Sequence, residues 1–125
     1  MGLSIGNALI NQGAHVAFAD LKPAPADIAS GPGNHCYFEG NLTDDGFVKQ
    51  AIDATASQFG GLDYLINTAG VLWFDRDTSV TEMDMDVWDQ VMAINVKSFA
   101  LTARHAVPLM KQRGDGGPGI DLTGR

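Results

Sequence analysis

Hydrophobic and polar positions follow two different periods along the chain. Segments with apolar residues every three or four positions predict helices, and short, almost wholly apolar runs predict buried strands. The predicted helices span residues 3–12, about 45–59 and about 85–112. The predicted strands span residues 15–19, 35–39 and 62–67, with a weaker candidate at 120–122. Gly13 and Gly60-Gly61 follow the first two helices, where glycine readily ends a helix in left-handed backbone.

The order of these elements predicts an α/β fold. Helices that alternate with apolar strands are typical of a parallel sheet, because each parallel connection needs a crossover. We therefore expect one domain, residues 1–125, with a doubly wound parallel sheet. Ligands of such sheets bind beyond the carboxyl ends of the strands. These ends carry polar or small residues here, at Asp20, at Asn41 and from Asn67 to Gly70.

Composition and charge narrow the classes of function. The 125 residues include 8 Lys and Arg against 15 Asp and Glu, a formal net charge of −7, which disfavours nucleic acid as a partner. The apolar runs are shorter than a membrane span of about 20 residues, so we expect no membrane partner. A single cysteine, Cys36, cannot form an internal disulfide and favours a cytoplasmic setting. The histidines lack zinc spacing, so we expect no metal site.

Three motifs stand in a fixed order along the chain, and together they resemble the short-chain dehydrogenase/reductase family. Residues 62–71, Leu-Asp-Tyr-Leu-Ile-Asn-Thr-Ala-Gly-Val, resemble that family's strand and Asn-x-Ala-Gly motif. Residues 88–98 are similar to its long interface helix, which carries the family's catalytic Asn, here Asn95. The segment from Gly2 through Gly13 to Asp20 resembles the helix after its glycine-rich turn and its second strand.

The resemblance also predicts an incomplete, Rossmann-like sheet. The family fingerprint is Gly, three residues, Gly, one residue, Gly, and counting back from Gly13-Ala14 places its last glycine at Gly2. The alternative is to take Gly2–Gly6 as the fingerprint. Only six residues then lie between Gly6 and Gly13, which is less than two turns of helix, and we reject this alternative. We therefore expect a fragment that lacks the family's first strand and its C-terminal strands. The strands at 15–19 and 62–67 then lose their shared neighbour. We therefore expect the isolated chain to be marginally stable or unfolded, unless the two strands pair directly or another chain fills the gap.

The resemblance implies an NAD site along the carboxyl edge of the sheet. Its residues would be Gly2 at the pyrophosphate, Asp20 at the adenosine ribose, Asn41 and Leu42 beside the adenine, and Asn67, Ala69 and Gly70 in the wall next to the cofactor. An acidic Asp20 favours NAD over NADP because it repels a 2′-phosphate, although Lys22 could neutralise one. Each of these residues also has a purely structural interpretation, as a strand-end carboxylate, a turn residue or a frayed terminus.

The catalytic set implied by the resemblance is only partly present. Asn95 would hold a water of the family's proton relay, and its structural alternative is an amide whose hydrogen bonds are satisfied in the core. The family's acid–base chemistry also needs a Tyr four residues before a Lys and a Ser upstream. The residues four before the chain's lysines are Phe18, Asp45, Ala93 and Val107. We therefore expect this chain alone to be inactive.

These observations leave two principal functions open. By resemblance, the intact parent would transfer a hydride between NAD(H) and a small alcohol or carbonyl substrate, as a homo-oligomer assembled through the helix near 85–112. The alternative is a non-catalytic binding or regulatory module that docks on a full-length partner through the same helix. A flavodoxin-like nucleotide binder is disfavoured, because the motifs at Asn67–Gly70 and Asn95 would then be coincidental.

Overall fold

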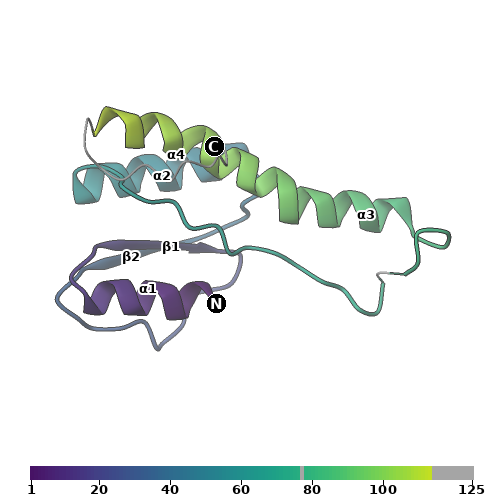
Figure 1. Cartoon of the computed structure of the whole chain (residues 1–125), viewed down its shortest axis with the longest axis horizontal. Helices are drawn as coiled ribbons and strands as arrows, with labels where there is room; N and C mark the ends of the chain where they lie inside the picture. Colours follow the sequence, from purple (N-terminus) through teal and green to yellow (C-terminus); the bar gives the residue numbers. More distant parts are fainter. Residues whose placement is uncertain (77, 114–125) are drawn as a thin grey trace, which may run out of the picture.

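A small parallel sheet lies between a single helix on one face and a helical layer on the other (Figure 1). The computed structural model describes residues 1–76 and 78–113. Its elements, in chain order, are α1 (Gly2–Asn11), β1 (Val16–Asp20), β2 (His35–Glu39), α2 (Asp45–Phe59), α3 (Met85–Met92), the π-helical turn η1 (Ala93–Lys97) and α4 (Ser98–Gln112). The prediction of an α/β fold with a parallel sheet is confirmed for these residues.

Local signals in the sequence set the ends of α2. The side chain of Asp44 accepts hydrogen bonds from the backbone N–H of Gly46 at 2.8 Å and of Phe47 at 3.2 Å. These bonds satisfy donors that the first helical turn leaves without a partner. Gly60 follows the last turn with φ 77°, a left-handed conformation that favours glycine. The predicted helix at about 45–59 is therefore confirmed at both ends.

The two strands form one parallel ladder. Its register pairs Val16 with His35 at one end and Asp20 with Glu39 at the other. Both predicted strands are confirmed, with the first beginning one residue later than expected, at Val16. The register brings two carboxylates, Asp20 and Glu39, together at the carboxyl end of the ladder.

Strand β1 has a paired edge and an open edge. The N–H of Val16 donates to Asn34 at 2.9 Å, and the carbonyl of Asp20 accepts from Gly40 at 2.9 Å. Since the backbone groups of successive residues in a parallel strand face opposite neighbours, those of Ala17 and Ala19 face away from β2. No third strand joins the sheet in residues 1–76 and 78–113. The predicted loss of a shared neighbour therefore agrees with the open edge of β1.

The prediction of a third strand at residues 62–67 is wrong for this structure. The segment crosses the molecule as an irregular trace after α2 (Figure 1), and it has no backbone hydrogen bond to β1 or β2 within the described residues. Its apolar character is typical of a buried strand, but a strand also needs a neighbouring ladder. The weaker candidate strand at 120–122 lies outside the described residues.

The predicted helix at 85–112 is continuous but not uniform. It begins at Met85 and ends at Gln112, as expected, yet the turn Ala93–Lys97 is π-helical rather than α-helical. Such turns are rare and occur mostly as single turns inside α-helices. Pro108 lies within α4 and does not end it. The interruption therefore falls at Asn95, in the middle of the motif, and not at the proline.

Helices α2 and α4 pack together and carry most of the buried core. The buried apolar side chains in the described residues are Ile10, Val48, Ala51, Val87, Leu101 and Ala106. A polar contact also joins the two helices, since His105 Nε2 lies 2.6 Å from Asp45 Oδ1. The hydrogen bond with His105 holds the pKa of Asp45 below its usual range. Asp45 therefore keeps its charge, and this contact, to more acidic pH than an isolated carboxyl would.

The open edge predicts an alternating pattern of amide exchange along β1. The amides of Val16, Phe18 and Asp20 face β2 and should exchange about tenfold or more slowly than those of Ala17 and Ala19, which face no strand. Residue-resolved hydrogen exchange of the purified chain measures these rates. Equal, strong protection at all five positions would show that the open edge is filled and would contradict the fold described here.

Candidate functional site

The side chain of Asn95 clamps the backbone of Val71. Its Oδ1 accepts from the Val71 N–H at 2.7 Å, and its Nδ2 donates to the Val71 carbonyl at 2.9 Å. Asn95 is half-buried, so both polar ends of its amide need partners, and Val71 supplies both. The structural interpretation of Asn95, an amide with satisfied hydrogen bonds, is therefore confirmed, and the amide fixes the chain just after Gly70.

Small residues let neighbouring parts of the backbone approach this clamp. A Cβ added at Gly70 would lie 3.4 Å from Asn95 Oδ1, and one added at Gly2 would lie 2.6 Å from Thr68 Oγ1. At the second distance the side chain of Thr68 would have to move, so Gly2 lets the start of α1 approach the segment Asn67–Gly70 closely. Three of the sequence motifs, at Gly2, at Asn67–Gly70 and at Asn95, therefore meet in one place.

Asn67 is held at the other end of the same segment by Thr102, a residue that is not among the predicted site residues. The hydroxyl of Thr102 in α4 donates to Asn67 Oδ1 at 2.9 Å, and it also lies 3.0 Å from the carbonyl of Phe99. Thr102 is seven residues after Asn95, close to two helical turns, so both side chains face the same segment. This spacing could have indicated that Thr102 contacts the same segment as Asn95. A threonine among apolar helix positions is, however, also typical of an ordinary core residue.

Asp20 and Asn41 lie together at the ends of the two strands and are both exposed. Asp20 Oδ1 accepts from the backbone N–H of Lys22 at 3.0 Å. Asn41 Oδ1 accepts from both the N–H and the hydroxyl of Thr43, each at 2.9 Å, which is the geometry of a turn asparagine. No hydrogen bond joins this pair to Gly2 or Asn95 within the described residues. Leu42 is half-buried beside them.

Negative charge gathers at this end of the ladder. The hydroxyl of Tyr37 donates to the Lys22 carbonyl at 2.6 Å. Burial, followed by the charges of Asp20 and Glu39, raises the pKa of Tyr37. A further anionic group placed here would be repelled by the charges of Asp20 and Glu39. Glu39 was not among the predicted site residues, although its place at the end of a strand opposite Asp20 could have indicated it.

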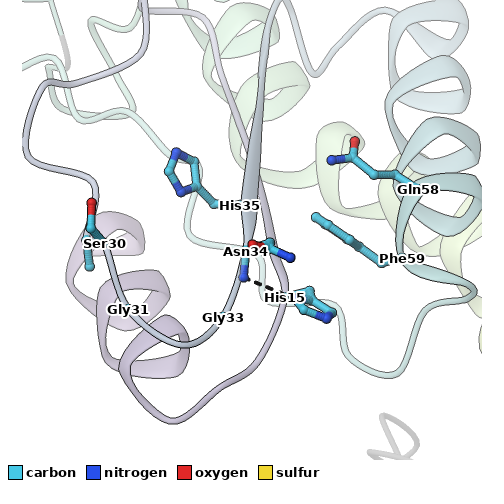
Figure 2. Close-up of a pocket in the computed structure, with 9 residues that line it drawn as sticks. His15, Ser30, Gly31, Gly33, Asn34, His35, Gln58 and Phe59 are labelled. Carbon is cyan, nitrogen blue, oxygen red and sulfur yellow. Dashed lines mark hydrogen bonds between the residues drawn. The ribbon is translucent and has the colours of Figure 1, made fainter.

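A cleft lies at the opposite end of the sheet (Figure 2). It is lined by the residue before β1, the loop that leads into β2, the first residue of β2 and the end of α2, namely His15, Ala29, Ser30, Gly31, Gly33, Asn34, His35, Gln58 and Phe59. The ring of His15 stacks on Phe59 with centroids 5.1 Å apart, and its Nδ1 accepts from the Asn34 N–H at 3.0 Å. Because ligands of parallel sheets bind at the carboxyl ends, this cleft is not the candidate site.

Comparison with known proteins identifies the family. A family model described as enoyl-(acyl carrier protein) reductase matches residues 1–120. The chain belongs to the short-chain dehydrogenase/reductase family. It is 32% identical to the short chain dehydrogenase andC of Emericella variicolor, and 29% identical to adrF of Penicillium rubens, each over 93% of this chain. Those matches cover only 45% and 44% of the relatives, so the chain spans less than half their length.

Solved structures of this family share the fold. A Serratia marcescens short-chain dehydrogenase/reductase is 30% identical with a TM-score of 0.75, over 87% of this chain and 46% of that one. The NADH-dependent reductase A1-R′ in complex with NAD is 24% identical with a TM-score of 0.76, over 90% of this chain and 48% of that one. The resemblance stated from the motifs is therefore confirmed.

Two further classes of site find no support in the part of the chain that the structure describes. No cluster of three or more His, Cys, Asp or Glu side chains is placed to hold a metal ion there. No helix among those residues is both long and apolar enough to cross a bilayer.

The clamp predicts a pH-dependent effect of Asn95→Asp. Aspartate keeps the acceptor for the Val71 N–H but loses the donor to its carbonyl, so the free energy of unfolding should fall by about 1–3 kcal/mol at neutral pH. The facing carbonyl disfavours the charged form and raises the pKa of the new carboxyl in the folded state. Protonation as the pH falls through that raised pKa restores a donor, so part of the loss should be recovered in acid.

Urea unfolding of the variant and the wild-type chain, at neutral and acidic pH, measures this effect. Asn41→Asp is the matched control, because both hydrogen bonds at Asn41 are accepted by its oxygen and survive the change. The control should stay within about 0.5 kcal/mol of wild type, as is usual for exposed sites. Equal losses in the two variants, or no acid recovery in Asn95→Asp, would count against the clamp.

Proposed function

We propose that the chain supplies the cofactor-binding half of an oxidoreductase that transfers a hydride between NAD(H) and a small alcohol or carbonyl compound. The observation that carries this proposal is the meeting of Gly2, the segment Asn67–Gly70 and Asn95 in one place. We call residues 67–71 the cofactor wall. Membership of the family supports the reaction class, and the arrangement of the wall supports the position of the cofactor.

The residues present fit a dinucleotide. No side chain caps the first turn of α1, so its backbone N–H groups can donate hydrogen bonds to a phosphate, and Gly2 has no Cβ to obstruct it. The exposed carboxylate of Asp20 can accept hydrogen bonds from ribose hydroxyls. Asn41 and Leu42 would flank the adenine, and Asn67, Ala69 and Gly70 would face the ribose on the nicotinamide side. When bound, the nicotinamide gives or receives the hydride.

The charges at the end of the ladder favour NAD over NADP. Asp20 and Glu39 are paired in the register, and after burial their charges are the further causes that raise the pKa of Tyr37. A 2′-phosphate would bring about two further negative charges into this field. The ammonium of Lys22 is the one nearby feature that would favour a phosphate. Because two carboxylates outweigh the charge of one lysine here, we propose NAD as the cofactor.

Asn95 is the proposed catalytic residue of this half. The two bonds to Val71 use one acceptor site and one of the two amide protons, so the side chain retains capacity for a water. A water held there would lie beside the cofactor wall, where a proton relay has to pass. The acid–base residues themselves, a Tyr four positions before a Lys and an upstream Ser, would come from sequence outside these 125 residues, and the chain alone is proposed to be inactive.

The long helix favours an interface role, either in a homo-oligomer or in the alternative, non-catalytic module. One stripe of α3, η1 and the start of α4 carries exposed apolar side chains, namely Met85, Trp88, Met92, Val96 and Phe99. Apolar patches of this kind are typical of surfaces that meet another protein. The catalytic parent remains the first proposal, because a module that only docks would not explain the wall and the charged strand ends. We also propose a cytoplasmic location for it.

Sequencing the transcript that encodes the chain distinguishes the two proposals. The catalytic proposal predicts an open frame that adds a strand with two more glycines before Gly2, and a Tyr-x-x-x-Lys motif beyond residue 125. The longer product should then oxidise NADH with a carbonyl substrate, whereas the 125-residue chain should show no turnover. Stop codons that close the frame at both ends would favour the docking module. Turnover by this chain alone would contradict the proposal that the acid–base residues come from sequence outside it.

A further inference from the structure

The geometry points to Thr102 as a positioning residue for the cofactor wall, acting together with Asn95. This inference rests on the proposed function in assuming that the wall faces the cofactor. The contacts that hold the wall do not depend on that assumption. The hydroxyl of Thr102 donates to Asn67 Oδ1 at 2.9 Å, while Asn95 holds Val71 at the other end of the wall. The wall is therefore fixed at its first and last residues by two side chains of one continuous helix.

Burial makes the Thr102 contact difficult to replace. Only 6% of Thr102 is exposed, and Asn67 is half-buried, so water is a poor substitute partner for either group. The carbonyl of Phe99 lies 3.0 Å from the same Oγ1, so the single hydroxyl proton of Thr102 is shared between this carbonyl and Asn67 Oδ1. A polar atom buried without a partner is costly, so loss of the hydroxyl should disturb Asn67 rather than leave it in place.

The lengths of the two segments agree with anchoring at two points. Val71 lies four residue steps after Asn67, and four steps span about 13 Å when extended, at about 3.3 Å per residue. Thr102 lies seven steps after Asn95, and seven steps span about 10 Å along a helix, at about 1.5 Å per residue. The wall thus runs along the helix from Thr102 back to Asn95. A single anchor would leave the wall free to pivot, whereas two anchors set both its position and its direction.

This arrangement gives the wall a support that its sheet does not supply. Residues 62–67 have no backbone ladder to β1 or β2 in the described chain, so the sheet cannot hold the segment in register. Between the two anchors lie Thr68, Ala69 and Gly70, and Thr68 Oγ1 is the atom against which Gly2 packs. A shift at Asn67 would therefore reach the start of α1 as well as the wall.

Two substitutions at Thr102 and one elsewhere test this role. Thr102→Val removes the hydroxyl with little change of shape, and Thr102→Ser retains it. Thr55→Val is the matched control, because Thr55 is also a buried helical threonine, 7% exposed, but its hydroxyl bonds to Ala51 within its own helix, at 2.7 Å. Exchange of the Val71 amide, followed by NMR, reports on the wall, and a titration with NAD reports on the cofactor.

Thr102→Val should speed exchange of the Val71 amide about three- to tenfold, as expected for the loss of one hydrogen bond, and should weaken NAD binding in the same direction. Thr102→Ser should stay within about twofold of wild type, and so should Thr55→Val at this amide. Equal acceleration in both valine variants, or an unprotected Val71 amide in the wild-type chain, would overturn the role of Thr102. If wild type fails to bind NAD while Val71 responds as stated, the proposed function fails and the anchoring role stands.

Discussion

The paired hydrogen bonds between Asn95 and Val71 are the interaction on which the candidate site depends. An asparagine side chain can present an N–H donor and a C=O acceptor to one backbone residue, as a neighbouring strand does. Here it binds a backbone segment that has no strand beside it in the described residues. The Asn95 amide therefore supplies hydrogen bonds to Val71 of the kind that a neighbouring strand would otherwise supply. With Thr102 at the other end, it ties the helical layer to the segment that the start of α1 also touches.

Features that depend on nearby residues could be predicted from the sequence, and features that depend on distant partners could not. The cap at Asp44, the left-handed Gly60 and the apolar periods place the helices, because each acts within a few residues. Residues 62–67 have the composition of a strand, but strand formation needs a neighbour. The π-helical turn at Ala93–Lys97 also escaped prediction, since apolar spacing does not reveal one extra residue in a turn.

The candidate site divides in the same way. Asn67, Gly70 and Asn95 could be named because they stand in motifs, and the structure brings them together with Gly2. Thr102 and Glu39 could not, because one looks like a core residue and the other like a surface charge until their partners are known. Asp20 and Asn41 lie at the predicted edge, yet no hydrogen bond connects them to the wall. Asp20 and Asn41 would form the adenosine end of the proposed site, and the wall would form its other end.

A titration of the isotope-labelled chain with NAD and with NADP, followed by NMR, tests this account most directly. The account predicts that NAD shifts the resonances of Asp20, Asn41, Ala69 and Gly70, and that NADP does so more weakly because of the charges at Asp20 and Glu39. The resonances of the cleft at His15 and Gln58 should stay in place. Shifts confined to that cleft, or an equal or stronger response to NADP, would contradict the account.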